Sequence, residues 1–135
     1  MIRQIKSINI KDDPIRSELD LAWRLRKGRQ IFGLYNYKLS AVVCVAKMMF
    51  VPKDVFELRQ SIGSGPIMVA YTLWSYQKGC GTMLIKELLK EAKRQKMKRL
   101  VTLSPLTDMA RNFHLKNGAK ELQTNKRSRN FEYKL

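Results

Sequence analysis

Residues 66–95 read PIMVAYTLWSYQKGCGTMLIKELLKEAKRQ, and this stretch decides the fold. It begins with the apolar, β-branched and aromatic run Ile67 to Tyr76, which is typical of a buried strand. The turn QKGCGT (77–82) follows, and from Thr82 to Gln95 the apolar residues recur on one face of an amphipathic helix. A strand, a glycine turn and a helix in this order direct free backbone N–H groups and a positive helix end toward an anion.

The glycine turn is compatible with phosphate binding but does not establish it. Gly79 and Gly81 allow the backbone to approach a phosphate closely, and Lys78 adds a positive charge. No Gly-Lys-Ser/Thr closes the turn, so it is not a Walker A loop, and it lacks the third glycine and the acidic ribose ligand of a dinucleotide site. An ordinary tight connection between strand and helix explains the turn equally well.

Length and composition indicate a globular protein. A chain of 135 residues, 44% of them hydrophobic, is large enough for one domain with a real core. No apolar run approaches the roughly 20 residues that span a bilayer, and residues 1–13 lack the apolar region of a signal peptide, so the expected location is the cytoplasm. Cys44, Cys80 and a single histidine provide neither metal-ligand spacing nor a disulfide framework.

The charge balance favours an anionic partner without identifying it. The sequence has 27 basic and 11 acidic residues, a formal net charge of +16. Such a field attracts polyanions and accelerates their encounter with the protein. A nucleic acid, an acidic substrate and a phosphate-rich cofactor all fit this charge, and so does a soluble basic surface that has no specific partner.

The rest of the chain alternates strand and helix signals. Asp13 and Pro14 predict the start of a helix that continues to Lys27, and Thr107 predicts the cap of another that ends at 117–118. The other predicted elements are a first strand over 2–10, a hairpin of strands over 30–35 and 39–47, a short helix up to Gln60, a loop over 61–66, a strand over 99–104, and closing strands over 120–124 and 131–135. This order predicts a mixed α/β sheet covered by helices, with residues 1–135 forming a single domain.

Two segments together resemble a known family. SYQKGCGT (75–82) lies between a strand and a helix, and ARNFHLKNGA (110–119) follows about thirty residues later. The first resembles the pyrophosphate loop of the Gcn5-related N-acetyltransferases (GNAT), and the second resembles a helix and strand start in the same family. The resemblance covers nearly the whole chain and implies a GNAT-like mixed central β-sheet flanked by helices.

The resemblance implies acetyl-CoA as acyl donor and assigns residues to its site. Backbone N–H groups of the turn would bind the pyrophosphate, and a backbone N–H near Leu73 would polarise the thioester carbonyl. His114 stands where many members have a tyrosine that protonates the leaving thiolate, and its ordinary pKa suits that role. The residues implied in cofactor binding are Tyr71, Leu73, Tyr76, Gln77, Lys78, Gly79, Cys80, Gly81, Thr82, Thr107 and Arg111, with Lys116 as a further candidate for the phosphates.

Several positions depart from the family pattern. Tyr76 replaces the usual Arg or Gln, Thr107 replaces an Asn that often holds the pantetheine arm, and Ala119 replaces the common Phe. No general base is identified, and Asp54, Glu57 and Tyr71 are only candidates. Trp74 and Tyr76, at the end of the strand, are candidates for substrate or cofactor contact, although packing explains a single aromatic residue as well.

The function implied is acetyl transfer to a primary amine of an unknown small molecule or protein. A second hypothesis is a GNAT-like basic module that has lost catalysis and binds nucleic acid or a protein, and a third is a related protein that uses another acyl-CoA. No membrane partner is expected, whereas pairing of the closing strands offers a route to a homodimer.

Overall fold

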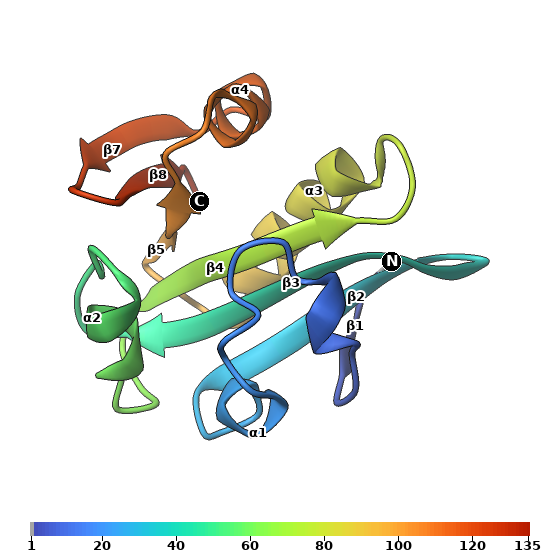
Figure 1. Cartoon of the computed structure of the whole chain (residues 1–135), viewed down its shortest axis with the longest axis horizontal. Coiled ribbons are helices and arrows are strands. Elements are labelled where there is room, and N and C mark those ends of the chain that lie inside the picture. The colour runs from blue at the N-terminus through green and yellow to red at the C-terminus, as the bar shows by residue number, and fades with distance from the viewer. Residues whose placement is uncertain (1) are drawn as a thin grey trace.

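The computed structural model describes residues 2–135 as eight strands and five helical segments. In chain order they are β1 (Ile2–Ile5), the 3₁₀ helix η1 (Ile10–Asp12), α1 (Leu21–Arg24), β2 (Arg29–Asn36), β3 (Lys38–Met48), α2 (Val55–Arg59), β4 (Ile67–Ser75), α3 (Cys80–Arg94), β5 (Arg99–Thr102), β6 (Ser104–Pro105), α4 (Asp108–Lys116), β7 (Lys120–Thr124) and β8 (Ser128–Tyr133). Figure 1 shows the long strands β2, β3 and β4 crossing the centre of the molecule.

The strands form one mixed sheet in the order β1-β2-β3-β4-β5-β8-β6, with β7 paired to β8. Only β4 and β5 run parallel; every other pair is antiparallel. The parallel pair requires a crossover connection, and α3 supplies it. This confirms the predicted mixed α/β fold, its central strand–turn–helix unit and the hairpin of β2 and β3.

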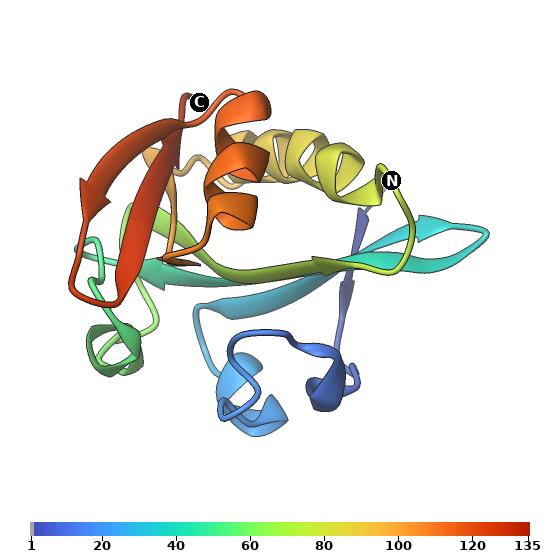
Figure 2. The same cartoon turned by 45° about the horizontal axis from the view of Figure 1, so that its top comes forward.

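Helices cover both faces of the sheet. In Figure 2, α3 and α4 lie on one side of it, and α1 and α2 lie on the other. The apolar stripe of α3, which includes Leu84, Ile85 and Leu88, packs with Val43 and Met68 of the sheet. A second cluster on the opposite face is built from Leu19, Trp23, Leu58, Tyr71 and Trp74 with residues of β2, β3 and β5.

The helix predicted from Asp13 to Lys27 is wrong, because only Leu21–Arg24 is α-helical and its cap is Asp20. The Asp13 carboxylate is buried and accepts hydrogen bonds from the backbone N–H groups of Ile15 and Arg16. It also pairs with the Arg24 guanidinium at 2.7 Å, and Arg24 donates to the carbonyl oxygens of Arg16 and Leu19. The segment therefore wraps around a buried ion pair, a tertiary interaction that overrides the helical pattern.

The predicted boundaries also move at the carboxyl end of the chain. The expected strand over 99–104 is interrupted at Leu103, and the closing strand begins at Ser128 rather than Phe131. Ser128 and Asn130 lie between the two predicted closing strands, yet both are buried in β8. Asn130 donates to the carbonyl oxygens of Pro52 and Thr102. These buried hydrogen bonds stabilise the start of β8, which therefore lacks the apolar sequence pattern by which a buried strand is predicted.

Candidate active site

Strands β4 and β5 separate at the middle of the sheet. They pair from Ile67 with Arg99 to Ala70 with Thr102, and the last bond between them joins Leu103 N–H to Ala70 O at 3.0 Å. Beyond this point the chain turns away, because β6 pairs with β8 and not with β4. On its other edge β4 stays paired with β3, with a register shift at Tyr71. The second half of β4 therefore has one open edge.

Backbone N–H groups of β4 face this open edge. The N–H of Tyr76 donates to Ser40 O of β3 at 2.8 Å. Alternate residues of a strand direct their N–H groups to opposite edges, so Trp74 also faces β3, while Leu73 and Ser75 face the other way. The Leu73 N–H is thus directed to the edge that β5 leaves open, as the resemblance implied for an oxyanion donor.

A groove of about 650 Å³ follows the open edge of β4. We call it the β4–β5 groove. It is lined by β4 from Ala70 to Ser75, the turn after it, the first residues of α3, and the segment from Leu103 to Lys116. Ten of the predicted site residues line it: Tyr71, Leu73, Tyr76, Gln77, Lys78, Gly79, Gly81, Thr82, Thr107 and His114. Lys116, the additional candidate, lines it as well.

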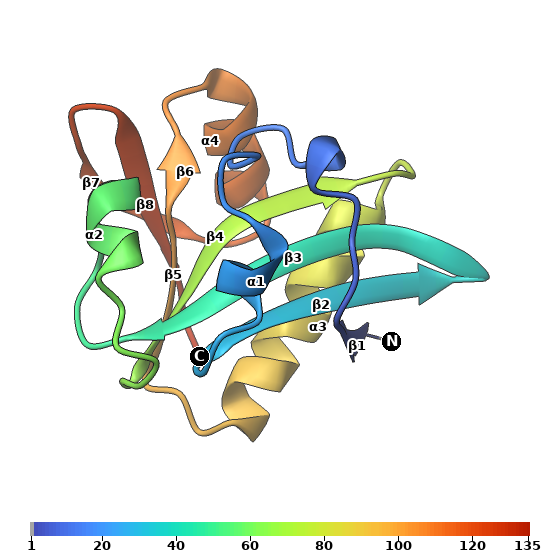
Figure 3. The same cartoon turned by 60° about the horizontal axis from the view of Figure 1, so that its bottom comes forward.

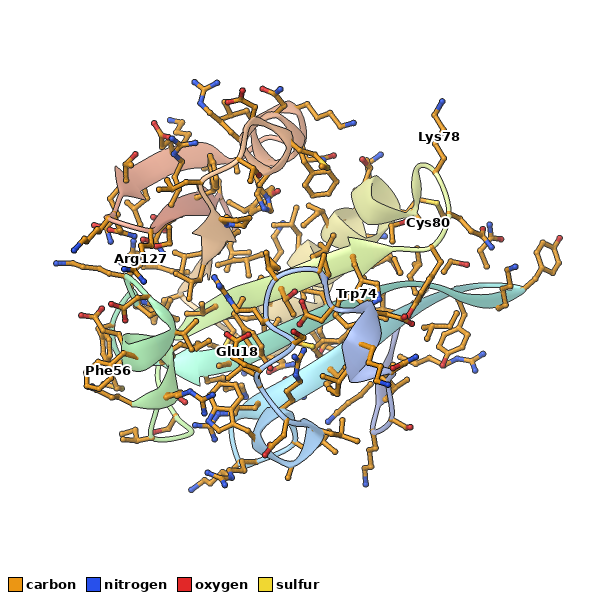
Figure 4. The ribbon with its side chains drawn as sticks, in the orientation of Figure 1. Glu18, Phe56, Trp74, Lys78, Cys80 and Arg127 are labelled. Atoms are coloured by element: carbon orange, nitrogen blue, oxygen red, sulfur yellow. The ribbon has the colours of Figure 1, made fainter. Side chains whose placement is uncertain are left out.

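The glycine turn forms the N-terminus of α3, which begins at Cys80, two residues before the predicted start at Thr82. Gly79 is the N-cap with φ of 84° and provides no side-chain cap. The Cys80 N–H donates to Gln77 O at 3.2 Å, so Gly81 and Thr82, which both line the groove, are the first-turn residues whose N–H groups remain for an anion. An added Cβ at Gly81 would come within 3.0 Å of the Phe113 ring, so the glycine allows Phe113 of α4 to pack closely against the start of α3. Lys78 extends from the turn into solvent (Figure 4).

Tyr76 is held in place by the N-terminal segment. Its hydroxyl donates to the Asp12 carboxylate at 2.6 Å, which links η1 to the residue before the glycine turn. Burial and the bond to Asp12 raise its pKa. Tyr76, which stands where the resembled family has Arg or Gln, therefore ties η1 to the start of the turn and adds no positive charge to it.

Thr107 and His114 both come from α4. The Thr107 hydroxyl accepts the Ala110 N–H at 3.2 Å as the cap of α4, as its sequence predicted, and retains its own proton to donate. His114 is buried beside Phe113, Phe131 and Tyr133, and its Nδ1 lies 2.7 Å from the Tyr133 hydroxyl. Burial lowers the pKa of His114 to about 4.

The low pKa of His114 contradicts the ordinary pKa on which its predicted role as a general acid depends. An imidazole with a pKa of about 4 is neutral at pH 7, so it carries no imidazolium proton to give to a thiolate. His114 nevertheless lines the groove, where a neutral imidazole can position a ligand through a hydrogen bond. Its catalytic role stays a prediction, with the expected ordinary pKa corrected.

Two predicted cofactor residues do not line the groove. The Cys80 side chain is buried in the core under α3, and Arg111 is exposed on α4. Of the three candidate bases, Asp54 and Glu57 lie at α2, outside the β4–β5 groove, and Tyr71 lines the groove. Glu57 accepts the Lys53 N–H at the start of α2, and Asp54 caps the same helix. Burial raises the pKa of the Tyr71 hydroxyl far above its usual range, so it stays protonated at neutral pH.

Sequence reasoning missed the contribution of the N-terminal segment to the groove. Pro14 and Ile15 line it together with Leu103, Ser104 and Pro105. Figure 3 shows this segment running over β3 and β4, and Figure 4 places Trp74 beneath it. The only available signal was the pair Asp13-Pro14, which also reads as a helix start. The Ser104 hydroxyl is bonded to that of Thr102 at 2.8 Å, which fixes it at the wall of the groove.

Across residues 2–135 the side chains form no cluster able to hold a metal ion. Over the same residues no helix has both the length and the apolar content to span a bilayer.

No family model and no curated protein matches this sequence. Solved structures do match its fold. The malonyl-CoA decarboxylase of Rhodopseudomonas palustris has 16% identity and a TM-score of 0.75, over 100% of this chain and 60% of that one. The IAA acetyltransferase of Bacillus cereus has 13% identity and a TM-score of 0.68, over 100% of this chain and 99% of that one. A Bacillus subtilis acetyltransferase in complex with CoA has 11% identity and a TM-score of 0.61, over 99% and 97% of the two chains.

These likenesses define the fold alone, which this chain shares with acetyltransferases, including a putative acetyltransferase of the GNAT family from Desulfovibrio desulfuricans with 8% identity and a TM-score of 0.69. The chain spans only part of the decarboxylases, 60% of the Rhodopseudomonas palustris protein and 35% of the one from Agrobacterium vitis. At sequence identities of 8–22%, the structural likeness establishes the architecture of the chain, and the activity has to be argued from the site.

Proposed function

We propose that this protein is an N-acetyltransferase that uses acetyl-CoA to acetylate a primary amine. The observation that carries the proposal is the open edge of β4, where the Leu73 N–H faces a groove that continues to the glycine turn at the N-terminus of α3. An extended pantetheine arm fits an unpaired strand edge, and a pyrophosphate fits free N–H groups at a helix start. The related folds that hold CoA support the same choice of donor.

The chain's own residues supply positioning and polarisation. The first turn of α3 binds the pyrophosphate, with Lys78 adding charge, and the Leu73 N–H donates to the thioester carbonyl oxygen. A bond forms between the amine nitrogen and the acetyl carbon, and the carbon–sulfur bond breaks. The amine loses one proton and the CoA thiolate gains one. No imidazolium takes part, since His114 is neutral at pH 7.

Replacing Gly79 with valine is expected to weaken acetyl-CoA binding at least tenfold. Gly79 has φ of 84°, a conformation that a β-branched residue avoids, so the variant rotates the backbone N–H groups of the turn away from the anion. Calorimetric titration with acetyl-CoA measures the affinity, and two salt concentrations separate a specific site from general attraction to a protein of charge +16.

Gly118 offers a matched control for this variant. It has φ of 99°, and an added Cβ at Gly118, as at Gly79, meets no atom within 4 Å. Gly118→Val therefore imposes similar strain outside the groove and should leave acetyl-CoA affinity unchanged. Equal losses in the two variants, or binding that disappears at high salt, would contradict the proposed cofactor site and favour a basic binding module. Malonyl-CoA as a second ligand tests the third hypothesis, another acyl donor.

A further inference from the structure

A second groove lies between α2 and the turn that joins β7 to β8. We call it the α2 groove; it has a volume of about 890 Å³ and is lined by Arg16, Lys53–Phe56 and Gln123–Ser128. Four of its residues are basic (Arg16, Lys53, Lys126 and Arg127) and one, Asp54, is acidic. Asp54 already uses one carboxylate oxygen to cap α2. The groove therefore presents an excess of positive charge to whatever occupies it.

The walls of the α2 groove are held together by hydrogen bonds that are buried or partly buried. Asn130 of β8 donates to Pro52 O at 2.9 Å, and the Ser128 hydroxyl donates to Lys53 O. The Asn125 side chain binds both Ser128 and Asn130, which orders the turn. Figure 3 shows α2 beside the β7–β8 hairpin. These bonds fix the distance between the two walls, so the groove is formed before any ligand binds.

Arg16 connects the α2 groove to the β4–β5 groove. Its guanidinium donates to Leu103 O at 3.2 Å, and Leu103, together with Pro14 and Ile15, lines the β4–β5 groove. Its Nε is buried and has no hydrogen-bond partner within residues 2–135. Such a donor is costly to leave unpaired, and the Arg16 side chain adds its positive charge to the lining of the α2 groove. Glu18 and Asp13 are the carboxylates whose charges act on Arg16, and Asp13 is committed to Arg24.

We infer that the acceptor amine carries an anionic group, a carboxylate or a phosphate, and that the α2 groove binds this group. This inference rests on the proposed acetyl transfer and names its acceptor class. The anionic group of the acceptor lies against Arg16, Lys126 and Arg127. The acceptor's carbon linker then extends past residues 14–16 and places the amine at the open edge of β4. Phe56, 72% exposed at the rim, offers an apolar surface to the linking chain.

Matched amines test the acceptor class. 4-Aminobutyrate, 3-aminopropyl phosphate, butylamine and putrescine all have a primary amine at the end of a short chain and differ at the other end. We expect kcat/KM for the two anionic amines to exceed that for butylamine and putrescine by about tenfold or more, the effect of one charge-assisted contact. Similar values for putrescine, or a preference for it, would overturn the inference while leaving acetyl transfer established.

Charge reversal at Arg127 tests whether the α2 groove is the source of the preference for anionic amines. Arg127 lies in the turn beside α2 (Figure 4), and Arg127→Glu should raise KM for 4-aminobutyrate about tenfold without weakening acetyl-CoA binding. Lys93→Glu changes the net charge equally on an exposed residue of α3, on the opposite face of the sheet, and should leave KM unchanged. Equal effects of the two variants would assign the preference to the overall charge and overturn the groove as its source.

Acetyl-CoA calorimetry keeps this inference separable from the proposed function. If acetyl-CoA does not bind, the proposed function fails and the inference fails with it. If acetyl-CoA binds and none of the four amines reacts, a ¹⁵N NMR titration with inorganic phosphate tests the groove directly. Chemical-shift changes at residues 53–56 and 123–128 would support an anion site there, and their absence would overturn it.

Discussion

Replacing Asp13 with alanine is expected to lower the free energy of unfolding by about 3–5 kcal/mol, the usual cost of leaving one partner of a buried ion pair alone. Asp13 and Arg24 are joined at 2.7 Å and both side chains are fully buried. Burial disfavours the charge of Arg24, but the hydrogen bonds and charges of Asp13 and Cys44 together outweigh this and raise the pKa of Arg24. Urea unfolding followed by tryptophan fluorescence measures the change.

Asp20→Ala is the matched control. Asp20 is also an aspartate that caps a backbone N–H, that of Trp23 at 2.7 Å, but its side chain is exposed to solvent. Its loss should cost about 1 kcal/mol. In the double variant Asp13→Ala/Arg24→Met, which contains no buried charge at this site, part of the lost stability should return. An Asp13→Ala cost no larger than that of Asp20→Ala would show that the ion pair does not hold the segment.

The same ion pair has a consequence for the site. The Thr72 hydroxyl donates to Asp13 at 2.9 Å, so the network ties the N-terminal segment to β4 beside the register shift at Tyr71. Pro14 and Ile15, the next residues, line the β4–β5 groove. The buried charge thus positions one wall of the groove, which is a reason to keep an ion pair where apolar residues would pack as well.

The parts of the fold that sequence reasoning predicted are those whose own residues carry the signal. The apolar run from Ile67, the glycines of the turn and the stripe of Leu84, Ile85 and Leu88 each determine a local structure that tertiary packing reinforces. Asp54 and Thr107 cap their helices as their types predict. The glycine turn was therefore placed correctly at the end of β4.

The parts that were missed depend on partners distant in sequence. Asp13 reads as a helix cap until Arg24 and Thr72 are brought beside it, and Asn130 reads as a turn residue until Pro52 and Thr102 accept its hydrogen bonds. Nothing local distinguishes a polar residue that will be buried and paired from one that stays in solvent. The prediction of an ordinary pKa for His114 was wrong for the same reason, because burial beside Phe131 and Tyr133 lowers that pKa.

Acidification from pH 7 to pH 4 is expected to cost about 3 kcal/mol of stability through His114 alone. Its pKa is lowered to about 4 in the folded protein, from the ordinary value near 6.5 in the unfolded chain. Between these values the unfolded chain binds more protons, so stability is fully present above pH 6.5 and is lost as the pH falls toward 4. The measurement is urea unfolding at a series of pH values.

His114→Asn isolates this contribution from that of the carboxylates. The asparagine side chain does not titrate, and its amide can replace the imidazole Nδ1 as the hydrogen-bond partner of the Tyr133 hydroxyl. The stability gap between the two proteins should therefore change by about 3 kcal/mol between pH 7 and pH 4. Parallel stability curves would contradict a lowered His114 pKa.

His114 is the only histidine in the sequence, so its imidazole resonances can be followed by NMR without further assignment. A titration midpoint near 4 is expected for the folded protein, because burial is the cause of the shift. A midpoint near 6.5 would mean that solvent reaches the ring and would restore His114 as a source of protons at neutral pH. This one resonance thus decides whether the proposed acetyl transfer has a histidine acid to use, or instead relies on solvent to protonate the departing thiolate while the N–H groups of β4 and α3 position and polarise the donor.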